Sequence, residues 1–266
     1  MSIEKKLNKI NVLQRQIQKK SSNQEKWNAD FIEQVKIDFT FSSNKLEGNS
    51  ITYGQTIQIL KDFITPKDAS VSDFLDIVNH KKVLDAVFEN YESEQITEAN
   101  IKKLHKELMK SFVQWSDGIH PNPGSYKIMD NRTYRSNGKE HIYLNPEDVL
   151  VAMAKLIDET NEALKSINIK SLTHHPLTIA TNFHYQFLNI IHPFGDGNGR
   201  LARIFMNLIL LQQGFPPIFI KVIDKTEYFD CFTKEEKIPG TMLDFMADRM
   251  IESLKEKKKF LTQRNS

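Results

Sequence analysis

The chain has 266 residues, of which 39% are hydrophobic and 26% charged, so it is long enough to bury a core and its composition excludes bulk disorder. Its 36 basic and 34 acidic residues give a formal net charge of +2, which excludes a global attraction to nucleic acid or to a membrane and leaves only local anion sites. The single cysteine, Cys231, excludes an intramolecular disulfide, and residues 1–20 lack the apolar run of a signal peptide. The most apolar run, residues 204–211, is too short to span a bilayer, so we expect a cytoplasmic protein.

Helical periodicity runs through the N-terminal third of the chain. Apolar residues recur at helical spacing over residues 3–17, before the break at "SSNQ", and a second helical phase runs from residue 24 to Leu46. Gly48 is placed to end that second helix in the left-handed conformation, so we expect Glu47 on its last turn. Thr52 is expected to N-cap a short helix, and longer helices are predicted at 71–91 and 97–112.

Residues 120–146 break the helical pattern, because they are rich in proline, glycine and asparagine. The β-prone pieces "YKIM" (126–129) and "HIYL" (141–144) stand on either side of a turn at "SNGK", which predicts a β-hairpin. Helical patterns return at 147–164, 174–191, 198–213 and about 240–260. The predicted fold class is all-α with one exposed hairpin. The two tryptophans, Trp27 and Trp115, are expected to anchor the core or an interface.

The stretch "HPFGDGNGRLAR", residues 192–203, carries the strongest chemical signal. Alternating glycines at Gly195, Gly197 and Gly199 let the backbone turn tightly and bring several N–H groups to one anion, and the loop then opens a helix whose N-terminus favours negative charge. Arg200 and Arg203 on that helix can also meet phosphate oxygens. We refer to residues 195–199 as the glycine loop.

Two more residues of this stretch suit phosphate chemistry. Asp196 would repel phosphate unless it holds a divalent cation, of which Mg²⁺ is the expected one, and His192 is a candidate general base. Other motifs fail on spacing. A P-loop needs Gly-Lys followed by Ser or Thr, a dinucleotide fingerprint follows a strand where this loop follows a helical pattern, and an EF-hand starting at Asp196 needs glutamate where Asn207 stands.

The stretch also resembles the signature of the Fic family. The fixed positions of that signature are all matched, by His192, Phe194, Asp196, Gly197, Asn198, Gly199, Arg200 and Arg203. The similarity covers roughly residues 96–211. It implies a helical core that transfers a nucleoside monophosphate, typically AMP from ATP, to a protein hydroxyl. It also implies a division into an N-terminal helical region (1–95), a Fic core with its hairpin (96–214) and a C-terminal helical extension (215–266).

The resemblance assigns a role to each position of the signature. His192 would deprotonate the target hydroxyl, while Asp196 would hold Mg²⁺ against the α- and β-phosphates of ATP. The glycine loop, with Gly195, Gly197, Asn198 and Gly199, would bind phosphate oxygens. Arg200 would steady the leaving β-phosphate, and Arg203 would reach the γ-phosphate. These roles agree with a chemistry in which the protein supplies positioning and charge neutralisation.

Two further segments acquire roles from the resemblance. In the family, a hairpin of this kind binds the target protein by strand addition, and here residues 128–143 would form it, with Ile128, Met129, Ile142 and Tyr143 contacting the target. Lys127 stands where the family often has an arginine. Tyr228 and Phe229 resemble an aromatic pair that borders the adenine, although core packing explains either ring equally well.

The stretch "SSNKLEGNSIT", residues 42–52, taken alone is an ordinary helix end. Beside the signature it resembles the family's inhibitory pattern, which Ser43, Glu47 and Gly48 satisfy. A Glu47–Arg203 pair would place a carboxylate where the γ-phosphate belongs and misalign the α-phosphate for attack. The chain therefore resembles the class with an N-terminal inhibitory helix in the same polypeptide, which needs no separate antitoxin.

The resemblance leaves other functions open. In some relatives the same glutamate orients a water that removes AMP from the target, so an AMP-removing or dual-acting enzyme is one alternative, and a nucleotide-sensing interaction module is another. Relatives often dimerise, so a homodimer is also open. About 50 residues follow Leu211, too few for the winged-helix module of many long relatives, so we expect no nucleic-acid partner.

Overall fold

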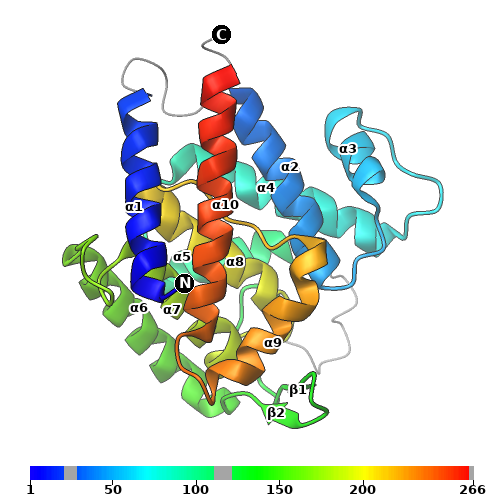
Figure 1. Cartoon of the computed structure of the whole chain (residues 1–266). Coiled ribbons are helices and arrows are strands. Elements are labelled where there is room, and N and C mark those ends of the chain that lie inside the picture. The colour runs from blue at the N-terminus through cyan, green and yellow to red at the C-terminus, as the bar shows by residue number, and fades with distance from the viewer. Residues whose placement is uncertain (21–28, 111–121, 264–266) are drawn as a thin grey trace.

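The computed structural model describes residues 1–20, 29–110 and 122–263, which form ten α-helices and one pair of antiparallel strands (Figure 1). Trp27 and Trp115 lie outside these residues. The α-helices are α1 (Ile3–Lys20), α2 (Ala29–Leu46), α3 (Tyr53–Lys61), α4 (Val71–Asn90), α5 (Glu98–Leu108), α6 (Val149–Lys165), α7 (Pro176–Tyr185), α8 (Asn198–Gln212), α9 (Lys225–Glu235) and α10 (Thr241–Gln263). A π-helical turn, η2 (Gln186–Ile191), continues α7, and two short 3-10 turns are η1 (Pro146–Asp148) and η3 (Val222–Asp224).

Local sequence signals fix the ends of the N-terminal helices. Gly48 has φ +96°, a left-handed conformation that is free of strain for glycine, and it follows the end of α2 as expected. Glu47 was expected on the last turn of α2, but α2 ends at Leu46, so Glu47 is the first residue after the helix. Thr52 caps α3 with a full capping box, in which its side chain accepts from the Gln55 backbone while the Gln55 side chain accepts from the Thr52 N–H.

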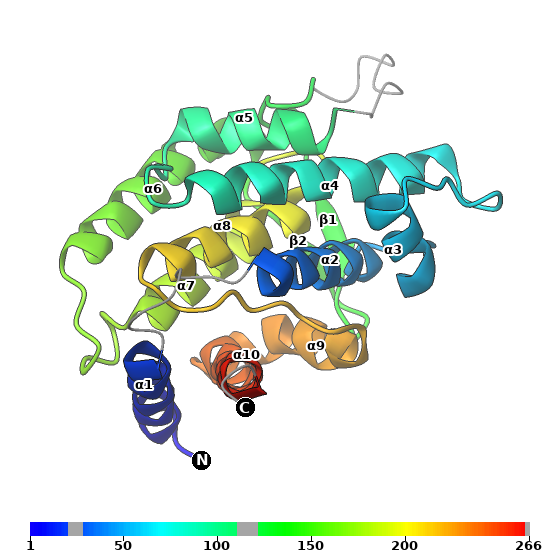
Figure 2. The same ribbon diagram turned by 90° about the horizontal axis from the view of Figure 1, so that it is seen from above.

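Helix α8 lies at the centre of the fold. Every residue from Asn198 to Leu211 is buried, and α8 contacts α2, α4, α5 and α7 on its different sides (Figure 2). A helix that is surrounded in this way needs apolar residues on all its faces, which the sequence "IFMNLILL" supplies. The first helix, α1, packs along the last one, α10, outside this centre (Figure 1). The glycine loop therefore opens the most deeply buried helix of the chain.

The hairpin forms, but its first strand is not where the sequence predicts it. Strand β1 is Arg132–Tyr134 and β2 is Glu140–Ile142, in the register Arg132↔Ile142. Continuing this register backward would place Ile128 opposite Pro146, which has no N–H to donate. The "YKIM" segment instead bonds to the signature, since the Lys127 N–H donates to the Pro193 carbonyl at 2.9 Å. The prediction of a strand at 126–129 was therefore wrong.

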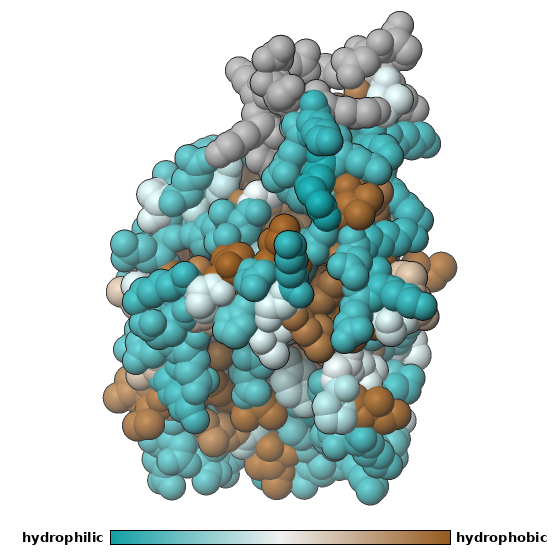
Figure 3. Space-filling model, turned by 60° about the vertical axis from the view of Figure 1, so that its left-hand side comes forward, coloured by the Kyte–Doolittle hydropathy of each residue, from teal (hydrophilic) through white to brown (hydrophobic). Residues whose placement is uncertain are grey.

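The C-terminal part contains one helix that the sequence did not predict, α9, which links η3 to α10. Hydrophilic residues cover most of the face that is turned forward in Figure 3, and hydrophobic residues form small patches on it. Within the described ranges, no helix is both long and apolar enough to cross a bilayer. The division at residues 95 and 214 stays a prediction.

Candidate functional site

A cleft of about 520 Å³ opens beside the glycine loop. Its walls come from the end of α2, the hairpin, the η2 turn, the start of α8 and α9. The predicted site residues that line the cleft are Glu47, Tyr143, His192, Gly195, Asp196, Asn198, Gly199, Arg203 and Phe229. The chain thus brings the signature, the hairpin and the candidate inhibitory glutamate to one place.

Buried side chains hold the glycine loop from behind. The Asn198 side chain accepts from the Phe194 N–H at 2.9 Å and donates to the Phe194 carbonyl at 2.8 Å, so it is used within the loop itself. Gly197 has φ +77°, and a Cβ there would lie 2.8 Å from the Met109 sulfur, so only glycine fits. The loop is therefore rigid in shape, with its backbone turned toward the cleft.

His105 of α5 provides a second support that the sequence reasoning missed. Its Nδ1 accepts from the Gly124 N–H at 2.8 Å, so Nε2 carries the proton and donates to the Asp196 carbonyl at 3.0 Å. The ring also stacks on Phe194, with centroids 3.7 Å apart and planes 7° from parallel. Burial lowers the pKa of His105 to about 4, which keeps it neutral.

His192 is oriented by the π-helical turn that precedes it. Its backbone N–H donates to the Phe187 carbonyl five residues back, its φ is +48°, and its ring stacks on Tyr143 at 3.9 Å. Nδ1 lies 2.9 Å from the Leu188 carbonyl and must donate to it, which leaves Nε2 without a proton in the neutral ring. Burial lowers the pKa of His192 to about 4, so the ring is a neutral acceptor near pH 7.

Arg203 is fully engaged by the candidate inhibitory residues. The guanidinium is 2% exposed and donates to the Ser43 hydroxyl at 3.0 Å, the Ser43 carbonyl at 2.9 Å and the Glu47 carboxylate at 2.6 Å. Burial alone would raise the pKa of the Glu47 carboxyl, but the charges of Arg203 and Arg200 hold it below its usual range. A Cβ at Gly199 would collide with this carboxylate, so Glu47 stands directly at the N-terminus of α8.

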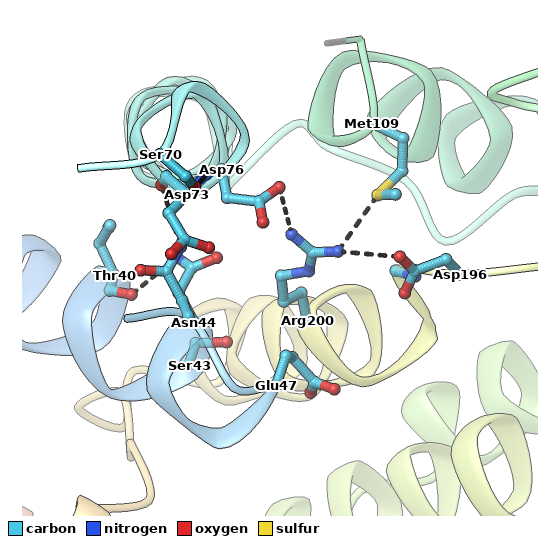
Figure 4. Close-up of polar contacts among 12 residues, drawn as sticks. Thr40, Ser43, Asn44, Glu47, Ser70, Asp73, Asp76, Met109, Asp196 and Arg200 are labelled. Atoms are coloured by element: carbon cyan, nitrogen blue, oxygen red, sulfur yellow. Dashed lines mark hydrogen bonds and ion pairs between the residues drawn. The ribbon is translucent and has the colours of Figure 1, made fainter. Parts of the chain in front are cut away.

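Arg200 is not one of the residues that line the cleft, but it is buried beside Asp196, which is. It is 3% exposed, and its Nη1 donates to the carboxylate of Asp76 on α4 at 2.7 Å (Figure 4). Its Nη2 lies 3.4 Å from the Met109 sulfur and 3.6 Å from Asp196. The sequence reasoning missed Asp76, because one aspartate on an amphipathic helix gives no local signal for a partner 124 residues later.

The remaining predicted residues divide between the cleft and the core. Phe229 lines the cleft, whereas Tyr228 is fully buried and its hydroxyl bonds to His184 at 2.8 Å. Ile128 and Met129 are exposed but lie outside the strands, and Ile142 is exposed on β2. The sequence reasoning missed the wall beyond His192, which is formed by Arg135, Asn189 and Phe232.

The donor set of the cleft can be compared with the needs of Mg²⁺. The described part of the chain holds no cluster of three or more His, Cys, Asp or Glu side chains that suits a metal ion. Asp196 offers one half-exposed carboxylate beside the glycine loop. A single carboxylate fits Mg²⁺, which keeps several waters and takes its other ligands from substrate phosphates.

Comparisons with known proteins agree with this geometry. Residues 95–210 match the model of the Fic/DOC family. The chain is 30% identical over 195 residues to a protein named Protein adenylyltransferase Fic from Nematostella vectensis, which covers 71% of this chain and 41% of that protein. It therefore spans about two fifths of the length of that curated relative.

Solved structures share the fold. A Fic domain containing signaling protein from Bacteroides thetaiotaomicron superposes with a TM-score of 0.79 at 27% identity, over 98% of this chain and 97% of that one. A structure of IbpAFic2 covalently tethered to Cdc42 superposes with a TM-score of 0.53 at 19% identity, over 94% of this chain and 69% of that one.

Proposed function

Because its residues 95–210 make this chain a member of the Fic/DOC family, we propose that it is a self-inhibited protein adenylyltransferase, which moves AMP from ATP to a hydroxyl group of a target protein. One observation carries the proposal: a neutral histidine with a free acceptor nitrogen, His192, lines the same cleft as the glycine loop and Arg203. A base beside an anion-binding helix N-terminus is the arrangement that nucleotidyl transfer requires.

In the proposed reaction, Nε2 of His192 takes the proton of the target hydroxyl while the oxygen attacks the α-phosphorus. The bond from the α-phosphorus to the bridging oxygen of the β-phosphate breaks, and pyrophosphate leaves. The Leu188 carbonyl holds the proton on Nδ1 and so keeps Nε2 as the acceptor throughout. Mg²⁺, held by Asp196, would neutralise phosphate charge, and the backbone of the glycine loop would receive phosphate oxygens.

The Glu47–Arg203 pair supports self-inhibition. Arg203 would reach the γ-phosphate, but its three contacts to Ser43 and Glu47 leave it engaged elsewhere, and the Glu47 carboxylate stands beside Gly199. A γ-phosphate entering this space would meet a negative charge. A displacement of the α-phosphate by about 1 Å is enough to lower the rate by roughly 100-fold.

The target would bind at the hairpin. Both strands are short and their outward residues are exposed, which suits the addition of an extended peptide strand. The structure of IbpAFic2 tethered to Cdc42 supports a protein as the substrate of a related fold. Tyr143, stacked on His192, would lie where the peptide meets the base.

Glu47 also favours a second candidate function, the removal of AMP from a target. One of its oxygens is bonded to Arg203, while the side chain is 35% exposed and lines the cleft, and its pKa is held below the usual range. A charged carboxylate at the α8 N-terminus is placed to orient a water toward a bound phosphoester.

The first test compares the parent chain with Glu47→Gly and Glu47→Gly/His192→Ala. Each is incubated with Mg²⁺ and each α-labelled nucleoside triphosphate in turn, and label on protein is measured. We expect label from ATP with Glu47→Gly, about 100-fold above the parent, and none with the double variant. Equal labelling by the parent and Glu47→Gly would contradict self-inhibition. No label with any variant, despite nucleotide binding by calorimetry, would contradict the transferase and favour a nucleotide-sensing module or AMP removal.

A matched pair of variants separates the contact from the charge. Glu47→Gln and Glu33→Gln remove the same charge from the end and from the body of the α2 segment, and Glu33 contacts Lys81 at 3.2 Å, outside the cleft lining. Only Glu47→Gln should raise labelling. For AMP removal, a target labelled by Glu47→Gly is purified and given to the parent or to Glu47→Gln, and release by the parent alone supports the second candidate.

A further inference from the structure

The ion pair between Arg200 and Asp76 joins the signature to the N-terminal region. Arg200 is the third residue of α8, and Asp76 lies on α4 (Figure 4). Asp76 and Asp196 lie on opposite sides of the guanidinium, with Asp76 at 2.7 Å from Nη1 and Asp196 at 3.6 Å from Nη2. Only the first of these is a hydrogen bond, so Asp76 fixes the orientation of the group.

The other edge of the guanidinium, formed by Nε and Nη2, makes no hydrogen bond to an oxygen of the described residues, and the Asp196 carboxylate lies 3.6 Å from Nη2 as an ion pair. Nε of Arg200 is buried without a hydrogen-bond partner in the described residues, and the sulfur of Met109, 3.4 Å from Nη2, is a weak acceptor. Nε and Nη2 form the edge of arginine that binds two oxygens of one phosphate side by side. A buried donor without a partner is costly, so this edge is the part of Arg200 that a phosphate would satisfy.

Structural attachment alone does not explain why an acid that is only 20% exposed lies here. Helix α4 already packs on its neighbours through Val83, Leu84 and Val87, which belong to the main hydrophobic core. A buried ion pair adds little net stability compared with apolar contacts of the same size. Its distinctive effect is to hold a guanidinium in one orientation.

The same helix also holds the segment that follows Glu47. The Asp73 carboxylate accepts from the Ser50 N–H at 3.0 Å and from the Ser50 hydroxyl, and the Asn49 side chain donates to the Asp73 carbonyl at 2.9 Å. Asp73 precedes Asp76 by three residues, so both acids lie on one face of α4. Helix α4 therefore fixes Arg200 and, one turn away, the chain beyond the inhibitory glutamate.

We propose that Asp76 is a positioning residue for the recognition of the β-phosphate: by holding Nη1 of Arg200, it keeps the Nε–Nη2 edge aligned for a β-phosphate of ATP or ADP. This inference rests on the proposed function, in which Arg200 is a ligand of the β-phosphate. AMP has no β-phosphate. Replacing Asp76 should therefore weaken the binding of ATP and ADP but leave the binding of AMP unchanged.

The test measures the Kd of ATP, ADP and AMP by calorimetry with Mg²⁺, on the full chain carrying Glu47→Gly so that Glu47 does not compete and His192→Ala so that no AMP is transferred. Asp76→Asn should raise the Kd of ATP and ADP by roughly 10-fold and leave that of AMP unchanged. Asp85→Asn is the matched control, because Asp85 is also on α4 and pairs with Lys36 at 2.6 Å outside the cleft lining. It should change none of the three affinities.

Two outcomes would overturn the proposal. Equal weakening of all three nucleotides by Asp76→Asn means a general structural role, and no change in any of them means that Asp76 does not position Arg200. Should Asp76→Asn fail to fold, Arg200→Lys and Asp76→Glu replace it. Arg200→Lys lacks the side-by-side edge and should lose ATP and ADP selectively, and Asp76→Glu should give a smaller loss of the same kind. Because binding is measured without transfer, a failure of the proposed reaction leaves this result readable.

Discussion

The glycine loop and the hairpin line the same cleft, yet the chain holds them in different ways. The loop is fixed from behind by the buried side chains of Asn198 and His105. The hairpin has strands of three residues with exposed outward side chains, and it is attached at its inner face, where Arg135 donates to Asn189 and the Leu144 N–H donates to the Ile190 carbonyl at 3.0 Å. The loop is therefore prepared for a ligand of fixed shape, such as phosphate, and the hairpin for a partner of variable sequence.

Acid should destabilise the fold through its buried histidines. Burial lowers the pKa of His105 and His192 to about 4 and that of His184 to about 3, below the ordinary 6.5. Away from the glycine loop, burial lowers the pKa of His80 well below 6.5 and that of His175 to about 4. The unfolded chain binds these protons first, so the stability from the neutral rings is complete above about pH 6.5 and is lost as the pH falls toward 4. We expect the free energy of unfolding, measured by urea titration, to fall by up to about 1.4 kcal/mol per pH unit for each ring.

His105→Gln tests how much of this acid-dependent loss of stability comes from the support of the glycine loop. Glutamine keeps a donor and an acceptor but does not titrate, so the dependence on pH should weaken by about one histidine. Lys103→Gln makes the same replacement at an exposed position of α5 and should leave the dependence as it is. If the free energy of unfolding of His105→Gln depends on pH as steeply as that of the parent, the support of the glycine loop by His105 is not acid-sensitive.

Asn198→Ala should break the loop without touching the hairpin. It leaves the Phe194 N–H unpaired in a buried site and the Phe194 carbonyl with only the long bond from Asn131 at 3.4 Å, which should cost about 2 kcal/mol of stability. In the Glu47→Gly background we expect protein labelling to fall by roughly 100-fold, because the loop no longer holds phosphate in line. Asn137→Ala in the hairpin turn, where the side chain accepts from the Lys139 N–H, is the control and should change labelling little. Similar losses of labelling in both variants would show that the glycine loop and the hairpin turn do not differ in this respect.

Tyr134→Ala should have the smallest effect on the fold. Tyr134 is 72% exposed on β1, so we expect the free energy of unfolding to change by less than about 0.5 kcal/mol. The KM for a protein target should rise while the KM for ATP stays constant, since Tyr134 belongs to the hairpin, the proposed docking site, at the rim of the cleft. A rise in the KM for ATP instead would show that this part of the hairpin binds the nucleotide rather than the target.

The sequence predicts best where one local signal decides the structure. The N-cap at Thr52, the left-handed Gly48 and the apolar α8 were all expected, and the structure contains them. The strand at 126–129 was wrong because its residues bond to Pro193, a contact that β propensity does not encode.

In the candidate site, the sequence predicted one long-range contact but not the contacts that support the glycine loop and Arg200, and the roles of the site residues stay predictions. The signature named the residues of the loop and Glu47 found its expected partner, Arg203. Asp76 and His105 could not be predicted, since each acts across about a hundred residues of chain through packing of α4 and α5 on the core. The position of Tyr228 in the core rather than in the cleft depends on the unpredicted helix α9.

The π-helical turn η2 makes the orientation of His192 in the cleft depend on the number of residues before it. It places His192 one residue further along than an α-helix would, through the bond to the Phe187 carbonyl. Deleting one residue between Phe187 and His192 would restore the ordinary helical step and rotate the histidine by about 100°. Every residue of the signature would remain after such a deletion, but the His192 ring would no longer face the cleft. Insertions and deletions in this turn should therefore be tolerated less well during evolution than most single substitutions in it.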